Sequence, residues 1–598
     1  MRSIRGMRRR LTAGRLPFLW LLADAALVAL VAGPAEVLLL YLLSPGVPLT
    51  LGGFVATLAA LLPQVVAVFV LAGPLLVLLA TALSVGRSTR RGITTRYVLR
   101  FALLDAALLA LATAYQWRSA AELLADPART ALALTQSALV AATVVLAALV
   151  VADLRWPGRV GAPWILAVTL GTVVALGIAT EIRRVRLPAP RPIEMPGFAA
   201  SRDLLLLEIP GLGADELARY SEIGAIPGLA GLRERGALFT IDGGPATDAL
   251  ALHATLITGR EPAAHGLIGS RRYRPVGSSR SFAIFPEGLF LRALLPTPLW
   301  SGEAVDHTAL RVAALPDIAR ALGVPAAIVG DPLGWRATTG RLLVVRRDAL
   351  AGGAAIGVGA DAPPVACPAI AETLAERFFD PPAAELAGTP ALEARVRRSL
   401  EEDLCALAVA REVVAGARFP LLHVRLGGHL RVARQFAGWR EVTPARGASQ
   451  GEIDAYGRTM ARYVRELDPA LGALLEAAGK RSLVAVVSPA GMRERQDLGR
   501  LAEALAGASG RTADLDGPPP GLLLLAGEGV ARRRAASGEL PLTSVLPTLL
   551  WGVDLPAAED MGPLAQRAFT REYLASHPLV TVAGYTAPAA PRGGPASD

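Results

Sequence analysis

The sequence predicts a chain in two parts: an α-helical membrane domain of about five spans, followed by an α/β domain whose mostly parallel central sheet is covered by helices. Three observations support this prediction. Of the 598 residues, 53% are hydrophobic and only 19% are charged, a charged share below the roughly 25% of soluble domains. Long apolar runs are confined to residues 16–182. Beyond residue 200, short apolar runs alternate with glycine turns and helical stretches, which is typical of a parallel sheet.

The membrane domain is predicted from apolar runs, because a bilayer-crossing helix needs about 20 apolar residues. We predict spans at 16–43, 50–83, 97–115, 131–152 and 162–182. The second run is too short for two spans and counts as one tilted or broken helix. Arginine-rich loops alternate with neutral ones, which places the N-terminus in the cytoplasm and the C-terminal domain outside it. The sequence therefore predicts a multi-pass protein of the cell membrane.

Two carboxylates, Asp24 and Asp105, fall inside the first and third predicted spans. Acidic residues within a span are costly and indicate function by default. The simpler interpretation, which we favour, is that they bond to neighbouring helices and hold them together. A transport or lipid-handling role of the membrane domain is the alternative.

The domain boundaries follow from composition. We assign 1–182 to the transmembrane domain, 183–200 to a proline-rich linker, 201–575 to the extracytoplasmic α/β domain and 576–598 to a disordered tail. The net charge of +10 does not indicate nucleic-acid binding, because after residue 200 the arginines are scattered rather than clustered on one face. Two cysteines, Cys367 and Cys405, exclude a disulfide scaffold and a cysteine-based zinc site. Whether these two pair is left open by the sequence.

Strands of the α/β domain are predicted where apolar runs end in glycine turns. They are DLLLLEIPG, PAAIVG, LLVV, FPLLHVRLGG, SLVAVVSPAG and GLLLLAGEGV, with helices at 391–416 and 452–478. In sheets of this class, chemistry is found just beyond the carboxyl ends of the strands. Functional residues are therefore expected in those loops.

Motifs in this part resemble a known family. LLLLEIPGLG, IPGLAGLRERGALFT and HATLITGREPAAHGL occur in that order, followed by ALPDIARALGVPAAIVG and LTSVLPTLLWGVDLPAAEDMGP. In these motifs the chain resembles the alkaline phosphatase superfamily, in particular its type I phosphodiesterase/nucleotide pyrophosphatase and sulfatase-like branch. A multi-span anchor with such an outer domain is also similar in architecture to lipoteichoic-acid synthases and phosphoethanolamine transferases. The resemblance implies an alkaline-phosphatase-like domain over nearly all of 201–570.

The resemblance also implies a chemistry, in which two divalent cations, usually zinc, are held by Asp and His while a Ser or Thr attacks phosphorus or sulfur. The family's ligand and nucleophile positions fall here on Pro210, Ala249, Leu430, Arg434, Pro489 and Ala490, with a late histidine position near Gly517. Most of these side chains offer a cation no lone pair, and Arg434 would repel it. We therefore expect a vacated site with no metal or other cofactor.

Other polar residues near these positions are the displaced candidates Thr247, Asp248 and His429. His253 and His265 belong to the framework of their motif and are expected to pack or to hydrogen-bond. The remaining polar residues of note are Glu208, expected to be hydrogen-bonded inside the structure, and the neighbours Asp306 and His307, which rarely converge on one ion.

We expect a catalytically degenerate, membrane-anchored member of this superfamily that acts as a binding or scaffolding module of the cell envelope. Its expected partners are membrane lipids and a phosphate-bearing lipid, a glycan or an envelope protein. The alternative is an active phosphodiesterase, phosphatase or phosphotransferase on envelope lipids or polymers. That enzyme would use the displaced residues, with zinc or another divalent metal as its cofactor.

Overall fold

The structure is a computed structural model of the chain. It describes residues 33–42, 44, 47, 49–63, 90–156, 162–182, 197–246, 248–282, 300–335, 341–351, 355–358, 364–368, 370, 378–381, 383, 386, 388–439, 449–494, 513–514, 520–532 and 537–585. The chain forms two compact units. The first comprises Met1–Leu187 with Arg271–Ala304, and the second comprises Pro188–Ser270 with Val305–Asp598.

The first unit is built from apolar helices. Three long ones are α3 (Arg90–Ala120), α4 (Asp126–Arg155) and α5 (Ala162–Ile182), and α4 packs against both of the others. Proline in the first turn of α4 fits a helix start, since its missing N–H would have no partner there. Leu99, Ala106, Leu146 and Ile165 form a buried cluster among the three helices.

Within the described residues, two helices are long and apolar enough to cross a membrane, Asp126–Arg155 and Pro163–Ile182. They coincide with the fourth and fifth predicted spans, so the structure supports two candidate spans and not about five. The described parts of the first two runs are the short helices Gly33–Leu42 and Leu51–Pro63. At 1.5 Å per residue these cover about 15–20 Å, less than the roughly 30 Å of a hydrocarbon core. The multi-pass topology and its orientation are therefore not confirmed.

Of the two carboxylates predicted to lie inside membrane spans, the structure describes only Asp105. Asp105 is half-buried on α3, the helix that contains the third predicted span. Asp24 lies outside the described residues, as do 16–32 and 64–83 of the first two predicted spans.

A hairpin interrupts the sequence of the α/β part and belongs to the first unit. Its strands β3 (Arg271–Pro275) and β4 (Trp300–Ala304) pair in antiparallel fashion. Tyr273 and Phe282 pack into a buried cluster with Val37, Tyr41 and Leu61, and the rings of Tyr41 and Phe282 meet edge to face at 5.1 Å. The structure thus divides the chain differently from our boundaries, which gave 201–575 to one domain. Tyr273 and Phe282 account for this placement of the hairpin, because aromatic side chains bury a large apolar area.

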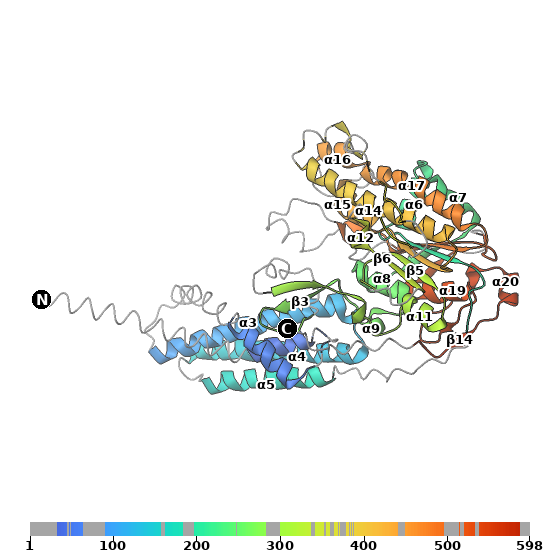
Figure 1. Cartoon of the computed structure of the whole chain (residues 1–598). Coiled ribbons are helices and arrows are strands. Elements are labelled where there is room, and N and C mark those ends of the chain that lie inside the picture. Colours follow the sequence, from blue (N-terminus) through green and yellow to red (C-terminus); the bar gives the residue numbers. More distant parts are fainter. Residues whose placement is uncertain are drawn as a thin grey trace. The chain divides into compact units, whose positions relative to one another are not determined.

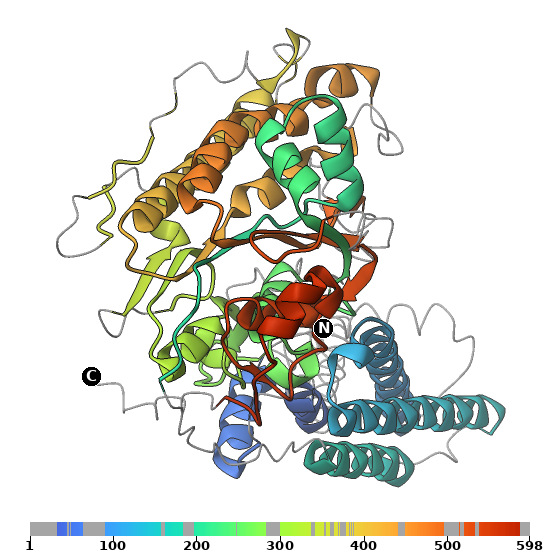
Figure 2. The same cartoon turned by 90° about the vertical axis from the view of Figure 1, so that its right-hand side faces the viewer.

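The second unit is built on an eight-stranded sheet that lies between layers of helices (Figure 2). The strand order is β12-β2-β11-β8-β1-β7-β5-β6. The strands are β1 (Leu204–Glu208), β2 (Ala237–Asp242), β5 (Ala326–Asp331), β6 (Leu342–Arg346), β7 (Leu421–Arg425), β8 (Leu483–Ala490), β11 (Pro520–Ala526) and β12 (Glu539–Pro541). Among the strands of this sheet, β11 alone is antiparallel to its neighbours, and all other neighbouring strands pair in parallel. The predicted mostly parallel sheet is therefore confirmed, with each predicted strand present.

Helices cover both faces of this sheet (Figure 1). On one face lie α14 (Thr389–Ala415), α15 (Gly427–Phe436) and α17 (Thr459–Ala478). The other face carries α8 (Ala249–Thr258), α11 (Leu315–Leu322) and α19 (Val545–Trp551). Where we predicted one helix over 452–478, the chain forms α16 (Gln450–Tyr456) and then α17.

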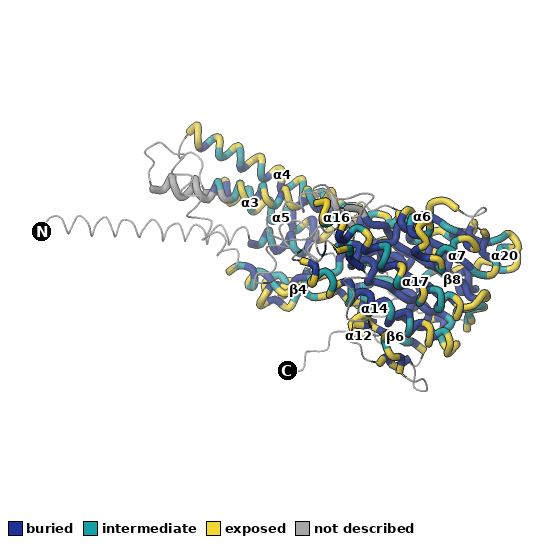
Figure 3. Tube along the Cα trace, turned by 90° about the horizontal axis from the view of Figure 1, so that it is seen from above, coloured by how far each residue is buried: buried dark blue, intermediate teal, exposed yellow. Residues whose placement is uncertain are grey.

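The central strands lie in the core of the second unit (Figure 3). Every residue of β1, β7 and β8 is buried, as expected for strands covered on both faces. Near the C-terminus, β14 (Thr581–Val582) pairs with β13 (Ala557–Ala558). The structure describes residues 576–585 of the predicted tail, of which Thr581 and Val582 form this pairing. Residues 586–598 lie outside the described part.

Candidate functional site

The carboxyl ends of β1, β7 and β8 meet at one edge of the sheet, since β1 lies between the other two and runs parallel to both. After β1 the chain turns at Pro210 and Gly211, where Gly211 has a φ of +85°. Its amide donates to the carbonyl oxygen of Ala490 at 3.2 Å. The turn after β1 and the end of β8, two of the places where the resemblance puts metal ligands, are therefore neighbours.

Apolar side chains close this edge. A Cβ added to Gly211 would lie 3.0 Å from Cγ of Met492 and 3.2 Å from Cδ1 of Leu430. Leu430, Ala490 and Met492 are 4%, 2% and 4% exposed. We call these three residues, packed around Gly211, the apolar seal. It consists of side chains that cannot hold a hard or borderline cation, apart from the weak thioether sulfur.

The other positions that the resemblance assigns lie on β8, α8 and α15. Pro489 is buried, and its carbonyl oxygen lies 3.0 Å from a Cβ built on Gly243. Ala249 is the first residue of α8, and Arg434 stands one turn after Leu430 on α15, half-buried. Gly517 lies outside the described residues.

The displaced candidates have structural partners. The Asp248 carboxylate caps α8, accepting from the amides of Leu250 at 2.8 Å and Ala251 at 3.2 Å. His429 is buried, and its Nδ1 donates to the carbonyl oxygen of Pro210 at 3.0 Å. Thr247 lies outside the described residues.

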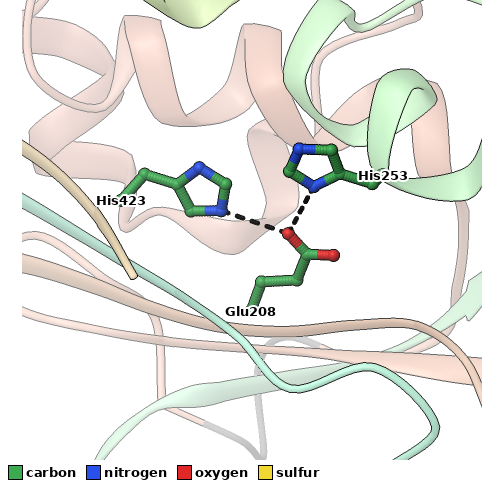
Figure 4. A group of neighbouring side chains, drawn as sticks. All are labelled: Glu208, His253 and His423. Atoms are coloured by element: carbon green, nitrogen blue, oxygen red, sulfur yellow. Dashed lines mark hydrogen bonds and ion pairs between the residues drawn. The ribbon is translucent and has the colours of Figure 1, made fainter. Parts of the chain in front are cut away.

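Polar side chains instead gather beneath the strand ends, inside the domain (Figure 4). Oε2 of Glu208 lies 2.7 Å from Nδ1 of His253 and 3.1 Å from Nε2 of His423. Oε1 of Glu208 accepts from Nε of Arg425 at 3.0 Å. All four side chains are at most 7% exposed. We call these four residues the inner cluster.

Local structure explains the inner cluster. Glu208 ends β1, and Arg425 ends β7 directly opposite it in the parallel register. His423 stands two residues earlier on β7, so its side chain points to the same face as that of Arg425. His253 comes from α8, which covers that face, and its ring stacks on the ring of His423 at 5.6 Å.

The electrostatics of the inner cluster favour an ionised Glu208 beside a neutral His253. Burial alone would raise the pKa of Glu208, but His253, Arg425 and the hydrogen bonds outweigh it and hold that pKa well below its usual range. Burial lowers the pKa of His253, although Glu208 opposes the shift. A carboxylate oxygen only accepts, so both ring nitrogens facing Oε2 donate N–H to it in the metal-free state.

Sequence reasoning identified part of the inner cluster. Glu208 is hydrogen-bonded inside the structure, as predicted, and His253 serves the framework. His423 and Arg425 were missed. The available signal was the pair of polar residues at alternating positions of the otherwise apolar strand LLHVR, because polar residues buried in a strand require partners.

The inner cluster corrects our prediction that no metal is held. Glu208, His253 and His423 each offer one ligand atom, and these atoms lie within 4.8 Å of one another. A carboxylate and two imidazoles are a donor set that suits zinc. The prediction was wrong because it tested only the strand-end positions, whereas these ligands lie two residues before Pro210, on α8 and inside β7.

Other histidines of the domain are structural. His265 is buried, with Nε2 3.1 Å from Oγ1 of Thr255, and Nδ1 accepts from the amide of Leu267. Asp306 accepts from the amide of Thr308, while the ring of His307 packs on that of Trp335.

Comparison with known proteins agrees with this fold. The parallel sheet, its helical layers and the strand-end edge define an alkaline-phosphatase-like domain. Residues 204–536 match the family "Type I phosphodiesterase / nucleotide pyrophosphatase". The match spans more than half of the chain, which therefore belongs to this family. No curated protein matches the sequence.

Several solved structures are similar. Phosphonoacetate hydrolase from Sinorhizobium meliloti is 16% identical, with 50% of this chain and 58% of the hydrolase covered and a TM-score of 0.31. Murine ectonucleotide pyrophosphatase/phosphodiesterase 5 is 11% identical, with 62% and 100% covered and a TM-score of 0.30. A 2-O GAG sulfatase is 12% identical, with 61% and 73% covered and a TM-score of 0.35. This chain spans less than two thirds of the hydrolase, and identities this low say nothing of activity.

Proposed function

We propose that this protein is a membrane-anchored member of its family whose α/β domain acts as a binding or scaffolding module of the cell envelope rather than as a two-metal phosphodiesterase. Two helices of spanning length support the anchoring. The alternation of arginine-rich and neutral loops supports a cytoplasmic N-terminus and an extracytoplasmic α/β domain.

The apolar seal is the observation that carries this proposal. Two-metal catalysis needs two cations about 3.5–4 Å apart to stabilise both the attacking and the leaving oxygen. Leu430, Ala490 and Met492 fill the edge where those cations would be held, and each is buried. A nucleophile is also lacking at the family's position, because Ala249 has no hydroxyl. Each 1.36 kcal/mol of lost transition-state stabilisation costs tenfold in rate.

An active hydrolase that uses displaced residues is the second candidate. It would need Thr247, Asp248 or His429 to act on a substrate, and Thr247 lies outside the described residues. The Asp248 carboxylate already accepts two amides of α8, and Nδ1 of His429 already donates to Pro210. Breaking such contacts costs about 1–3 kcal/mol for each buried group left without a partner. We therefore favour the binding module, for which Arg434 is a candidate contact to a phosphate-bearing lipid or glycan.

The test is turnover of a generic phosphodiester by the full chain in detergent, with and without added zinc or manganese. We expect no turnover in any sample. The matched control is the Thr247→Ala, His429→Ala double variant. Metal-stimulated turnover that disappears in the double variant would overturn the proposal and establish the displaced-site hydrolase.

A further inference from the structure

We infer that Glu208, His253 and His423 form a site for one divalent cation of the zinc class, enclosed within the α/β domain and built from other residues than the ligand positions that the resemblance assigns. The inference goes beyond the proposed function, because it concerns cation binding inside the fold and requires no turnover. It rests on the geometry of three ligand atoms from β1, α8 and β7.

The three atoms converge on one point. Nδ1 of His253 and Nε2 of His423 both face Oε2 of Glu208, at 2.7 and 3.1 Å, and the three lie within 4.8 Å of one another. Two ligands of one zinc ion, each about 2.0–2.2 Å from it, stand at most about 4.4 Å apart. In a tetrahedral zinc site the ligand atoms stand about 3.4 Å apart, so the carboxylate–imidazole contacts at 2.7 and 3.1 Å must open to admit an ion.

The donor chemistry selects the class of cation. Two imidazole nitrogens and one carboxylate oxygen suit zinc or a neighbouring transition metal. Magnesium and calcium prefer oxygen ligands throughout. When an ion binds, the two N–H···O hydrogen bonds are replaced by coordination bonds. Each imidazole stays neutral because its proton moves to the other ring nitrogen. Binding of the ion therefore releases no proton from these ligands.

Arg425 explains why the site takes one ion. Its Nε donates to Oε1 of Glu208, the oxygen that faces away from the imidazoles. This contact orients the carboxylate, in the way that outer hydrogen bonds hold metal ligands. The guanidinium also places a positive charge beside Oε1, which disfavours a second cation on that oxygen. The inner cluster is thus suited to a single ion, in contrast to the pair that the family resemblance implies.

The experiment measures metal directly. The full chain is purified in detergent, stripped with a chelator, reloaded with zinc, desalted and subjected to elemental analysis. We expect about one zinc per chain. His253→Gln and His423→Gln each remove one ligand while keeping a side chain that can hydrogen-bond to Glu208. In both variants we expect zinc affinity to fall at least about 100-fold, more than the 10–100-fold typical of losing an outer hydrogen bond.

The matched control is His265→Gln, which changes a buried histidine of the same domain outside the inner cluster. It should keep about one zinc per chain, and far-ultraviolet circular dichroism verifies that each variant is folded. Cobalt loaded into the unmutated chain gives a second readout, because nitrogen–oxygen coordination produces visible d–d absorption. Substoichiometric zinc in the unmutated chain, or retention of zinc by both ligand variants, would overturn the inference.

Discussion

A single carboxylate, Glu208, brings a negative charge into the interior of the α/β domain. Removing such an ion from water costs several kcal/mol unless its partners are well placed. Here Arg425 stands opposite it across β1 and β7, and two imidazoles face its other oxygen. The charge is tolerated because every partner comes from an element that the fold already holds in place.

The first prediction concerns this charge pair in chelator-treated protein. Glu208→Gln leaves the buried guanidinium of Arg425 without its counter-charge, and should lower the free energy of unfolding by about 3–5 kcal/mol. Urea unfolding followed by tryptophan fluorescence measures the change. The Glu208→Gln, Arg425→Met double variant should recover part of the loss. An unchanged unfolding midpoint in the single variant would show that the Glu208–Arg425 pair does not contribute to the free energy of unfolding.

The second prediction concerns pH and His265. Burial, with the nearby charges of Arg311 and Arg260, lowers the pKa of His265 to about 3. The unfolded chain therefore binds this proton more tightly. The stability it contributes is complete above pH 6.5 and is lost as the pH falls toward 3, at about 1.4 kcal/mol per pH unit. His265→Gln should remove that slope, about 2 kcal/mol between pH 6.5 and 5, in urea unfolding at a series of pH values. Equal slopes in the two proteins would refute it.

At the scale of elements, the N-terminus of α15 is fixed from two neighbouring helices. The Asp403 carboxylate on α14 accepts from the amides of Gly428 at 2.9 Å and His429 at 3.2 Å. The hydroxyl of Tyr463 on α17 donates to it at 2.8 Å. Burial raises the pKa of Asp403 to about 6, although Arg431 and the hydrogen bonds oppose the rise. These contacts position Leu430 within the apolar seal.

The third prediction compares two adjacent glycines at this helix start. A Cβ on Gly428 would lie 2.3 Å from the Tyr463 hydroxyl and 2.4 Å from the carbonyl oxygen of Ser399. Gly428→Ala should therefore lower the free energy of unfolding by about 1–3 kcal/mol or more. Gly427→Ala meets only the ends of two arginines, at 3.2 and 3.3 Å, and should stay within about 1 kcal/mol of the parent. Equal effects in thermal unfolding would contradict this account of α15.

At the scale of the whole molecule, a disulfide and an inserted hairpin connect distant parts of the sequence. Cys367 and Cys405 are joined, with Cα atoms 4.6 Å apart, so the segment 364–368 is tied to α14. The β3–β4 hairpin returns the chain to the helical unit after the α/β fold has begun. The disulfide closes a loop between cysteines 38 residues apart in the sequence, which constrains the unfolded chain.

The fourth prediction follows from the disulfide. Such bonds persist in oxidising compartments, so the proposed extracytoplasmic α/β domain should keep its cysteines paired. In membranes dissolved with detergent and denatured, a maleimide–polyethylene glycol reagent should shift the chain on a gel only after reduction. The Cys367→Ser variant, with one free thiol, is the control and should react without reductant. Two reactive thiols before reduction would contradict both the pairing and the orientation.

Much of the α/β domain was predictable from the sequence because its signals are local. A buried parallel strand is a short apolar run that ends in a glycine turn, and LLLLEIPG or SLVAVVSPAG can be identified without knowing its neighbours. The family motifs are likewise contiguous. In the structure Pro210 follows β1, Pro489 and Ala490 end β8, and Leu430 lies on α15 after β7. The prediction of spans was weaker, since apolar length alone does not show where a helix ends.

The inner cluster was decided only by the tertiary structure. Glu208, His253 and His423 are far apart in the chain, and each alone resembles a satisfied core residue. They meet because β1 pairs with β7 in one register and α8 covers the same face. Sheet order, register and helix placement are set by the burial of the whole core, which no local pattern contains. For the same reason the sequence left the pairing of Cys367 with Cys405 open and assigned the hairpin to the other domain.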